Sequence, residues 1–241
     1  MFFLFSWRRN GKLFFMKCFV FAMKKEARPL LNESVIRSSR DYGYGTIYEA
    51  EKDGIPFLAG VSGIGKAFAA SLITAICLTH PEVEEIVNIG AGGSLSGEKA
   101  PLLSAVIASS FSNHDIDTTS FGDPIGLVSG LNIVDFPASK RINGSLESVC
   151  KRLEIPYTYG VISTGDQFIV DEDKKEKIAK VFGAISVDME SAAMAQIAYT
   201  YKKEFSALRI VSDTGNQGEY EAYVGRASEL AKDVAIALLK A

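Results

Sequence analysis

The sequence predicts a single α/β domain in which helices flank a mixed sheet, and three observations favour it. A chain of 241 residues is within the size at which α/β folds remain undivided. Its composition, 47% hydrophobic and 23% charged, is that of an ordinary globular protein. After an early meander, strand-like and helical stretches alternate without repeats, low-complexity tracts or linkers.

Residues 1–15 stand apart from this pattern. The apolar run Met1–Phe5 is too short for a signal sequence, and its basic residues follow it where they should precede it. No stretch reaches the ~20 apolar residues of a membrane span. Because Met16 stands just before a clean strand pattern, we interpret residues 1–15 as a disordered N-terminal extension and residues 16–241 as the single domain.

The first half of the domain predicts four strands and one buried helix before residue 100, and a further strand after it. Asp53-Gly54 suits the tight turn of a hairpin. The helix is apolar almost all round, as expected of a helix against a sheet, and Pro81 ends it. In order, we expect strands at Lys17–Met23, Gly45–Glu51 and Ile55–Val61, a helix at Lys66–His80, a strand at Glu85–Ile89 that runs into a glycine turn at 90–93, and a strand at Leu102–Ala108.

The second half alternates helix and strand more regularly. The last helix has apolar residues at three- and four-residue spacing with charged residues opposite, which is the pattern of an amphipathic helix. Before it we expect helices at Lys140–Leu153, Val170–Phe182 and Met189–Tyr201, and strands at Tyr157–Ser163, Ala184–Val187 and Phe205–Ser212.

Charge and cysteine content exclude several classes of protein. The net charge is −3 and no basic stretch is long enough to follow a phosphate backbone, so we expect no nucleic-acid partner. Cys18, Cys77 and Cys150 are too widely separated for a disulfide framework or a structural zinc site. Each is interpreted as a small apolar core residue, which suits a reducing, cytoplasmic location.

Two glycine-containing segments follow predicted strands. The segment 60–67 (GVSGIGKA) nearly matches a phosphate-binding P-loop, but Ala67 lacks the hydroxyl that binds Mg²⁺. A glycine turn before a buried helix explains the same residues. The segment 88–94 (NIGAGGS) places glycines at the carboxyl edge of the sheet, where α/β folds bind ligands, although a plain loop is an equally good interpretation.

Two polar segments are also candidates for a site. Residues 113–122 (NHDIDTTSFG) contain His114 and two aspartates, but neighbours in an extended strand point to opposite faces, so a hydrogen-bonded loop is favoured over a metal site. Residues 163–169 (STGDQFI) end a strand, and Phe168 there could stack on a base, or belong to the core.

Two acidic residues occupy positions suited to catalysis. Glu190 falls in the first turn of a predicted helix, where the helix dipole alone would favour it. Asp213 directly follows an apolar strand, where it is either an N-cap or a catalytic group. Neither position is decisive by itself.

Taken together, these segments resemble the 5′-methylthioadenosine/S-adenosylhomocysteine nucleosidase family of the nucleoside phosphorylase/hydrolase fold. The resemblance covers Met16 to Ala241 and follows the family's order and spacing. It rests on Ala22-Met23 with Glu26, on 62–66 (SGIGK), on the glycines after Asn88, on His114-Asp115 with Asp117 and Phe121-Gly122, on 165–169 (GDQFI), on Met189-Glu190, and on Arg209 with Ser212-Asp213.

The resemblance implies a three-layer αβα sandwich that forms a homodimer, uses no cofactor or metal, and hydrolyses methylthioadenosine and S-adenosylhomocysteine to adenine and a thioribose. It also implies the catalytic groups. Asp213, held by Ser212, protonates N7 of adenine; Glu26 activates water; Glu190, beside Met189, binds the ribose hydroxyls.

The implied substrate-binding residues come from seven separate segments. Phe168 stacks on adenine and the backbone of Ile169 reads its edge. The full set is Met23, Ile64, Ala91, Gly92, Phe121, Phe168, Ile169, Met189, Arg209 and Ser212. There are two departures from the family pattern: Ala91 replaces a usual hydroxyl residue, and Lys24 and Lys25 stand where acids are common.

Carboxylates suit this chemistry because breaking an N-ribosidic bond builds positive charge on the sugar. Asn88 stands where the hexameric phosphorylases of this fold have an arginine, so hydrolysis is favoured over phosphorolysis. Three alternatives stay open: a futalosine hydrolase, a purine nucleoside phosphorylase of the same fold, and, from another class, a non-catalytic nucleoside-binding protein.

Overall fold

The computed structural model describes residues 8–9, 12–13 and 16–241. Two short strands, β1 (Arg8–Arg9) and β2 (Lys12–Leu13), pair antiparallel ahead of the domain. The expectation that residues 1–15 form a disordered extension falls mostly on residues outside the described ones, and it stays a prediction.

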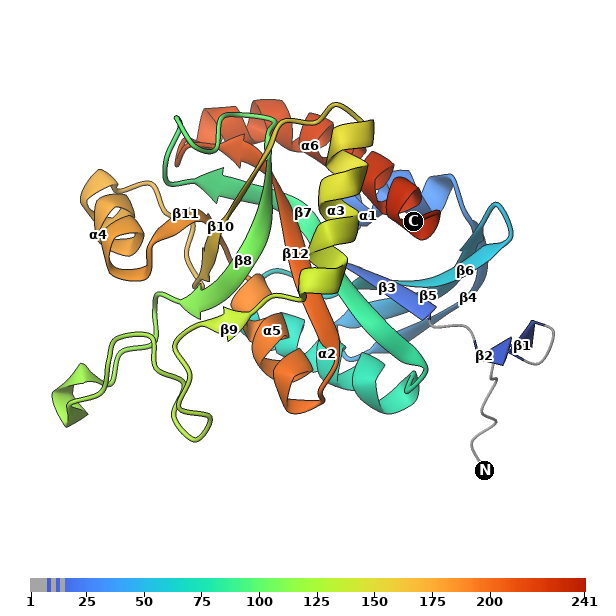
Figure 1. Ribbon diagram of the computed structural model, residues 1–241, viewed down its shortest axis with the longest axis horizontal. Helices are drawn as coiled ribbons and strands as arrows, with labels where there is room; N and C mark the ends of the chain where they lie inside the picture. Colours follow the sequence, from blue (N-terminus) through green and yellow to red (C-terminus); the bar gives the residue numbers. More distant parts are fainter. Residues whose placement is uncertain (1–7, 10–11, 14–15) are drawn as a thin grey trace.

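One mixed sheet of ten strands forms the centre of the molecule (Figure 1). Its path runs β11-β10-β8-β12-β7-β3-β6-β5-β4, with β9 paired to β8. The far end of β7 also pairs with β11, so that β7, β12, β8, β10 and β11 close on themselves. The strands are β3 (Met16–Phe21), β4 (Val35–Tyr42), β5 (Gly45–Lys52), β6 (Ile55–Val61), β7 (Val83–Ser94), β8 (Ala105–Asn113), β9 (Phe136–Pro137), β10 (Tyr157–Thr164), β11 (Ala184–Asp188) and β12 (Glu204–Asp213).

Helices cover both faces of this sheet, which confirms the predicted three-layer αβα architecture (Figure 1). On one face lie α1 (Lys24–Asn32), α3 (Lys140–Arg152) and α6 (Gln217–Leu239); on the other lie α2 (Lys66–Thr79) and α5 (Ser191–Thr200). Helix α4 (Glu172–Phe182) packs beside β11 at the sheet edge, and a short 3₁₀ turn, η1 (Thr119–Phe121), lies in the long loop after β8.

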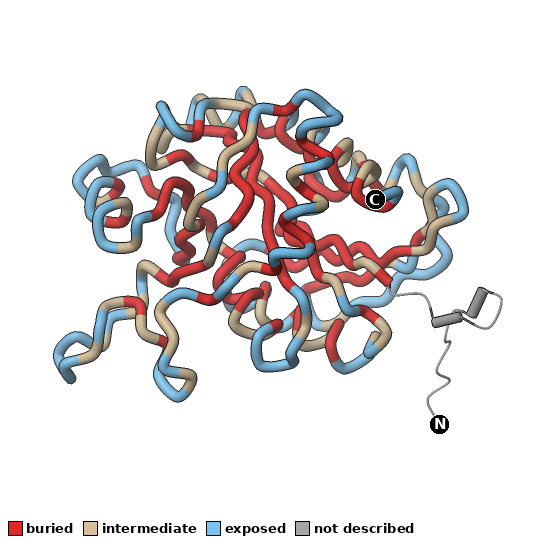
Figure 2. Tube along the Cα trace, in the orientation of Figure 1, coloured by how far each residue is buried: buried red, intermediate tan, exposed pale blue. Residues whose placement is uncertain are grey.

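Strand β3 shows how the sheet separates two cores. Cys18 and Val20 join the apolar cluster beneath α2 and α5, whereas Phe19 and Phe21 join the cluster beneath α1, α3 and α6. All four are fully buried. The strand is therefore an unbroken apolar run, as expected of a strand covered on both faces, and Figure 2 shows the buried chain concentrated at this centre.

Most predicted elements are found within a few residues of their expected bounds. The hairpin of β5 and β6 turns at Asp53-Gly54, where both residues have positive φ. Apart from the two-residue strands and η1, two elements were not predicted. No element was expected at α1, and β4 is an edge strand exposed along most of its length, which leaves no apolar alternation to recognise.

The expected glycine turn at 90–93 was wrong. These residues continue strand β7 and pair with β12, with Gly90 opposite Arg209 and Gly92 opposite Val211. A Cβ on Gly92 would lie 2.9 Å from the Arg209 Cβ, and one on Gly90 would lie 2.9 Å from a Glu26 oxygen. The glycines therefore give two charged side chains room to lie against the sheet.

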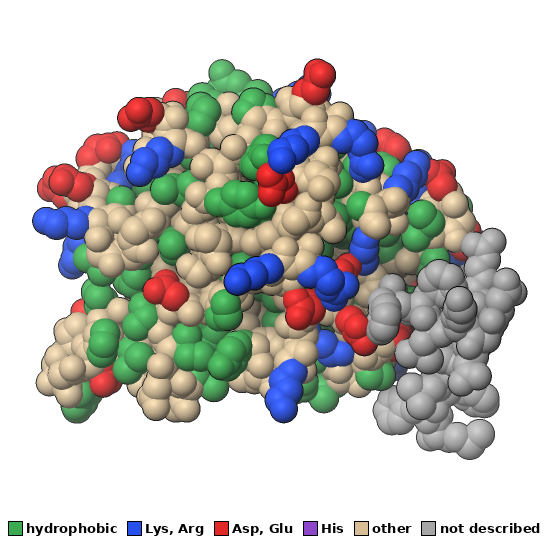
Figure 3. Space-filling view, viewed as in Figure 1, with side chains coloured by type: hydrophobic (Ala, Val, Ile, Leu, Met, Phe, Trp, Pro, Cys, Tyr) green, Lys and Arg blue, Asp and Glu red, His purple; other side chains and the backbone are tan. Residues whose placement is uncertain are grey.

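The surface charges, the helices and the cysteines are those of an ordinary globular protein. On the face shown in Figure 3, acidic and basic side chains are interspersed. Within the described ranges, none of the helices combines the length and apolar character that a membrane crossing requires. Cys18, Cys77 and Cys150 are buried free thiols, as predicted.

Candidate active site

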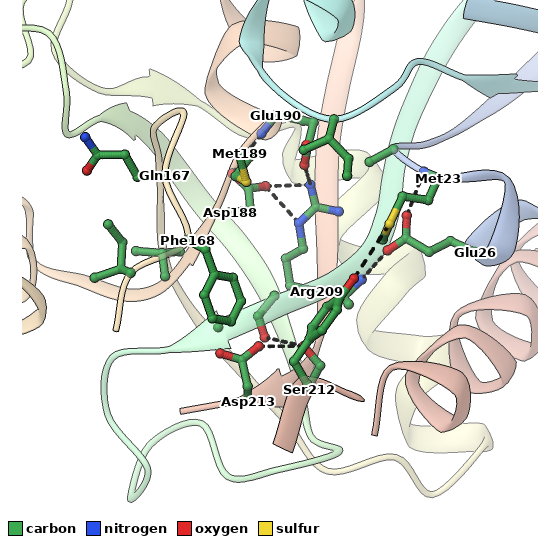
Figure 4. A pocket seen from close by; sticks show the side chains of 18 of the residues that line it. Met23, Glu26, Gln167, Phe168, Asp188, Met189, Glu190, Arg209, Ser212 and Asp213 are labelled. Carbon is green, nitrogen blue, oxygen red and sulfur yellow. Dashed lines mark hydrogen bonds and ion pairs between the residues drawn. The ribbon is translucent and has the colours of Figure 1, made fainter. Parts of the chain in front are cut away.

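A cavity of about 570 Å³ opens where β3, β7, β11 and β12 end. Ends of strands are where α/β sheets bind ligands, because backbone and side chains there are held by the sheet while the loops leave space. Figure 4 shows Glu26, Glu190 and Asp213 on different sides of the cavity, with Arg209 between them and the Phe168 ring beside Asp213.

Glu26 enters the cavity from the first turn of α1. Its two oxygens accept hydrogen bonds from the backbone N–H groups of Met23 and Ala91, both at 3.0 Å. The residue is 2% exposed. Burial raises the pKa of Glu26 above its ordinary value, although the Ala91 N–H and the charge of Arg209 act against this. The carboxyl group is thereby adapted to exchange a proton with a water molecule.

Arg209 and Asp188 form a buried ion pair beneath the cavity (Figure 4). Asp188 accepts from Arg209 Nε at 2.8 Å and from Nη2 at 2.5 Å, and Nη2 also bonds Asn88 and the Ser191 hydroxyl. Burial would raise the pKa of Asp188, but the adjacent guanidinium and the hydroxyls of Ser191 and Thr164 hold it below its usual value. Asp188 is therefore a fixed negative charge.

Glu190 lies beside this pair and has a different environment. Arg209 Nη2 is 3.9 Å from one of its oxygens, and the backbone N–H of Gly65 donates to the other at 3.0 Å. Burial, followed by the negative charge of Asp188, raises the pKa of Glu190 to about 8. The surroundings of Glu190 thus disfavour its ionised form, and a positively charged group placed beside it would stabilise that form.

The backbone explains why Glu190 is free to serve the cavity. The sequence placed it in the first turn of a helix, but it is the residue just before α5, and its side chain makes no capping bond. The Asp188 side chain caps the helix instead, because its carboxylate accepts hydrogen bonds from the backbone N–H groups of Glu190 at 3.3 Å and Ser191 at 3.2 Å. Helix stability therefore does not account for Glu190.

Asp213 ends β12 on the opposite side of the cavity. Its Oδ2 accepts from the Ser212 hydroxyl at 2.8 Å, and its Oδ1 accepts from the N–H of Gly215 at 2.9 Å. It is 2% exposed. These two bonds fix the orientation of the carboxyl group toward the cavity, and neither makes Asp213 an N-cap, since Asn216 caps α6.

The opening of the cavity is built from apolar and aromatic side chains. Phe168 is 47% exposed, and its ring lies edge-on to Tyr220 with 5.8 Å between centroids. The Tyr220 hydroxyl is 3.6 Å from the Met23 sulfur, and Lys25 Nζ is 4.8 Å from the centre of the Tyr220 ring. Tyr220 thus links the Phe168 side of the opening to the Met23 side.

The structure brings all but one of the predicted site residues to this cavity. Those that line it are Met23, Glu26, Ile64, Ala91, Gly92, Phe168, Ile169, Met189, Glu190, Arg209, Ser212 and Asp213. Phe121 does not line it. That side chain is 86% exposed on η1, in the loop that projects from the domain at the lower left of Figure 1.

Eight further lining residues were not predicted as site residues. Four of them are polar and lie outside the segments described above: Asp188, Gln217, Tyr220 and Glu221. Asp188 carried a usable signal, because it ends an apolar strand just as Asp213 does. The other three lie at the start of α6, ahead of the apolar pattern that marked this helix, and nothing local distinguishes them from surface residues.

A metal site finds no support in the part of the chain that the structure describes, where no group of three His, Cys, Asp or Glu side chains could hold an ion. His114 and Asp115 lie in the turn after β8 and not in the extended strand that the prediction assumed, and their side chains have different neighbours. The His114 ring lies against Gly165, whereas Asp115 pairs with Lys66.

Comparisons with known proteins agree with this geometry. The family model described as the phosphorylase superfamily matches residues 17–241. The 5′-methylthioadenosine/S-adenosylhomocysteine nucleosidase of Shewanella halifaxensis is 30% identical over 201 residues, which cover 78% of this chain and 86% of that protein. The aminodeoxyfutalosine nucleosidase of Campylobacter jejuni is 29% identical, with 83% and 86% covered.

Solved structures show the same fold. A 5′-methylthioadenosine/S-adenosylhomocysteine nucleosidase from S. pneumoniae, with the transition-state inhibitor MT-ImmA, superposes with a TM-score of 0.84 at 27% identity, covering 94% of this chain and 99% of that one. A futalosine hydrolase of Helicobacter pylori superposes with a TM-score of 0.88 at 22% identity, covering 94% and 97%.

Proposed function

The chain belongs to the phosphorylase superfamily, and from this premise we propose that it hydrolyses the N-ribosidic bond of 5′-methylthioadenosine and S-adenosylhomocysteine. Water adds to C1′ of the sugar, the bond to N9 breaks, and adenine leaves with a proton. The products are adenine and the 5-thio-substituted ribose, which are the compounds that methionine salvage takes up.

One observation carries this proposal. Glu26, Glu190 and Asp213 come from parts of the chain that are far apart, yet all three are buried and line a single cavity. Burying a carboxyl group in its charged form costs free energy, so the stability of the fold gives no reason to bury three of them together. Three around one space suit a reaction that forms a cation and must move protons.

The two carboxyl groups on the ribose side act on the sugar. As the bond to the base stretches, C1′ becomes oxocarbenium-like. Opposite charges ~4 Å apart attract by about 4 kcal/mol at an effective dielectric of 20. Ionised Glu190 would therefore stabilise the transition state more than the neutral ground state, while binding the ribose hydroxyls. Glu26 accepts the proton of the attacking water.

Asp213 is the acid that helps the base to leave. When protonated it donates to N7 of adenine and neutralises the charge that builds on the purine. The bond from the Ser212 hydroxyl leaves one carboxyl oxygen positioned for this role. A positioned acid contributes about 10²–10⁴ in rate.

Recognition of the nucleoside falls to the side chains nearer the opening. Phe168 stacks on adenine, and the backbone of Ile169 reads its edge. Met23, Ile64 and Met189 provide apolar surface for the sugar and thioether, and Ala91 and Gly92 let the sugar approach the sheet. Arg209 acts by holding Asp188 and Glu190.

The charges favour water over phosphate as nucleophile. Among the described residues around the cavity, five carry carboxylates and Arg209 is the one cation, already paired with Asp188. A phosphate dianion placed beside C1′ would meet Glu26 and Glu190 without an uncommitted positive group. The phosphorylase alternative therefore receives no support from this site.

A second candidate substrate is a futalosine-type nucleoside. The opening is bordered by Gln217, Tyr220 and Glu221, with Lys25 beside the Tyr220 ring. Polar groups at that place suit a 5′ arm longer and more polar than a methylthio group. The base and ribose parts of the site would be used in the same way.

We also propose that the protein is a cytoplasmic homodimer. Tyr44 and Phe68 stack at 4.5 Å between centroids, and Phe68, Tyr44 and Ile64 are 43%, 72% and 51% exposed. Exposed apolar clusters of this kind are typical of interfaces. Phe121 lies outside its own cavity, so its implied role in substrate binding requires a second copy. Molar mass by light scattering tests this, with a monomer as the contrary result.

The function is tested by adenine release from methylthioadenosine, S-adenosylhomocysteine and aminodeoxyfutalosine, with and without phosphate. We expect rapid, phosphate-independent release from the first two. Faster release from aminodeoxyfutalosine would favour the second candidate. Tight binding of the nucleosides without any adenine would show a binding protein instead of an enzyme.

A further inference from the structure

Two segments that contain polar residues without a role in the proposed reaction meet at the side of the cavity. One is the P-loop-like segment 60–67, and the other is the polar loop that follows β8. Lys66 Nζ lies 2.5 Å from Asp115 Oδ1. Both side chains are only 21% exposed. Lys66 is therefore committed to a carboxylate within its own chain, which leaves the phosphate-binding interpretation of this segment without its cation.

The same two residues are joined to a third loop. The other oxygen of Asp115 accepts from the backbone N–H of Asp166 at 3.0 Å. The side chain of Asp166 in turn accepts from the backbone N–H of Lys66 at 2.8 Å, at the first turn of α2. Asp115, Lys66 and Asp166 thus form a closed ring of three contacts. We call this ring the loop bridge.

The loop bridge connects to both ends of the substrate site. Asp166 immediately precedes Gln167, Phe168 and Ile169, which line the base side of the cavity. Gly65 immediately precedes Lys66, and its N–H is the donor to Glu190 on the ribose side. A displacement of this ring would move the base-binding loop and the Glu190 donor together.

The base-binding loop has few other restraints. The N–H of Gly165 donates to the Asp188 carbonyl at 3.2 Å, and that of Gln167 donates back to the Gly165 carbonyl at 2.7 Å. The Gln167 side chain also accepts from Lys174 on α4. The residues from Asp166 to Phe168 are exposed. An exposed loop must be ordered at an entropic cost before it can stack on a base. The contacts from Asp115 supply that order in the absence of substrate.

The charge state of Asp115 suits this role. Burial alone would raise its pKa, but the hydrogen bond from Lys66 and the N–H of Asp166 lower the pKa below its ordinary value. The carboxylate is therefore ionised at neutral pH, when it can accept from both donors at once.

We propose that Asp115 and Lys66 are positioning residues, whose contacts with Asp166 hold the 165–169 loop in the geometry that binds adenine. The proposal rests on the function proposed above and deepens it, because it assigns base selectivity partly to residues that touch no substrate. It also accounts for the spacing of glycine and lysine in segment 60–67 without any phosphate ligand.

The test compares Asp115→Asn with a matched control, Asp117→Asn. Asp117 lies two residues further along the same loop, and its carboxylate contacts only Thr119 at 2.9 and 2.7 Å. We expect Asp115→Asn to raise KM for methylthioadenosine about tenfold with little change in kcat, since a displaced binding group costs affinity first. Asp117→Asn should behave as the unmodified protein does.

Two readouts separate positioning from general stability. The preference for methylthioadenosine over methylthioinosine should fall in Asp115→Asn, because a loosened loop discriminates the base edge less well. In a Phe168→Ala background, the effect of Asp115→Asn should shrink below about threefold. Lys66→Met breaks the same contact from α2 and should reproduce both results if Asp115→Asn folds poorly.

The proposal is overturned if Asp115→Asn and Asp117→Asn have the same KM and base preference, or if the Asp115 effect is unchanged without the Phe168 ring. Either outcome in an active enzyme leaves the proposed function intact. Absence of adenine release from the unmodified protein would instead remove the function itself.

Discussion

The inner wall of the cavity and its opening differ in almost every physical respect. The inner wall consists of Glu26, Asp188, Glu190, Arg209 and Asp213, which are all under a tenth exposed. Arg209 lies within β12, and the four acids stand at strand ends or helix starts. The opening consists of Ile64, Phe168, Gln217, Tyr220 and Glu221, which come from loops and the start of α6 and are partly or largely exposed. Chemistry that tolerates little displacement is placed on the rigid part, and recognition on the adaptable part.

This difference has an energetic side. On the inner wall, like charges are held close together and away from water, and the pKa of Glu190 is raised to about 8 as a result. The opening stores no such strain, since its side chains are partly or largely exposed to water and Glu221 is the only acid among them. Substitutions on the inner wall should therefore change rate and stability, whereas substitutions at the opening should change affinity.

The largest effect is expected at Asp213. Asp213→Asn keeps the shape of the side chain and removes the proton donor, so kcat should fall by about 10²–10⁴. The measurement is single-turnover adenine release, with thermal melting as the control for folding. Near-normal turnover would mean that proton donation does not reside on the inner wall.

At Glu190, the burial that is proposed to serve catalysis should lower the free energy of unfolding near neutral pH. Its raised pKa means that the folded state binds a proton more tightly than the unfolded state does. Between the ordinary value near 4.5 and about 8, the free energy of unfolding should therefore fall as the pH rises, by up to about 1.4 kcal/mol per unit. Below and above that window this group adds no slope.

Glu190→Gln removes the titrating group, so the variant should lose that slope and be more stable than the unmodified protein at pH 8, while turning over far more slowly. Urea titrations at pH 5 and pH 8 measure the difference. A variant that is equally destabilised at both values would show that Glu190 stabilises the fold, which the comparison of the two regions does not allow.

Substitution of Phe168 should have an effect of intermediate size, on substrate affinity and not on the rate. Stacking of a base on an aromatic ring is worth about 1–3 kcal/mol, so Phe168→Ala should raise KM for methylthioadenosine by roughly 5- to 150-fold while kcat changes little. Steady-state kinetics decide the split. A loss confined to kcat would move Phe168 from recognition to chemistry.

The smallest effect is expected at Tyr220. Tyr220→Phe keeps the ring beside Phe168 and Lys25 and removes only the hydroxyl near the Met23 sulfur, a weak acceptor at 3.6 Å. We expect less than about a threefold change in KM for methylthioadenosine. A larger change for S-adenosylhomocysteine alone would show that the hydroxyl contacts the longer 5′ arm.

The sequence predicts the layered fold well because the apolar residues of strands such as β3 and helices such as α2 indicate which elements are buried. It predicts α1 poorly, since Lys24 and Lys25 with an internal proline hide a short helix. The run Gly90–Gly93 was misjudged because glycine is typical of turns, whereas here it makes room for Arg209, a neighbour that only the folded sheet supplies.

The site follows the same division. Asp188 and Asp213 each end an apolar strand, where an acid stands out. The resemblance to a family located the other inner-wall residues and Asp213 by position, but it did not locate Asp188. Residues of the opening such as Tyr220 depend on where α6 begins relative to Met23, 197 residues away in the chain. The local sequence pattern does not predict a contact between residues so far apart in the chain. Which of Asp188 and Glu190 caps α5 was likewise decided by backbone geometry.

If the carboxylates of the inner wall direct water to C1′ of the sugar, as proposed, then phosphate takes no part in the reaction. The mass of the sugar product shows this when methylthioadenosine is turned over in saturating phosphate. We expect free methylthioribose, formed at a rate that phosphate does not change. Methylthioribose 1-phosphate, formed in step with adenine, would show that phosphate is the nucleophile.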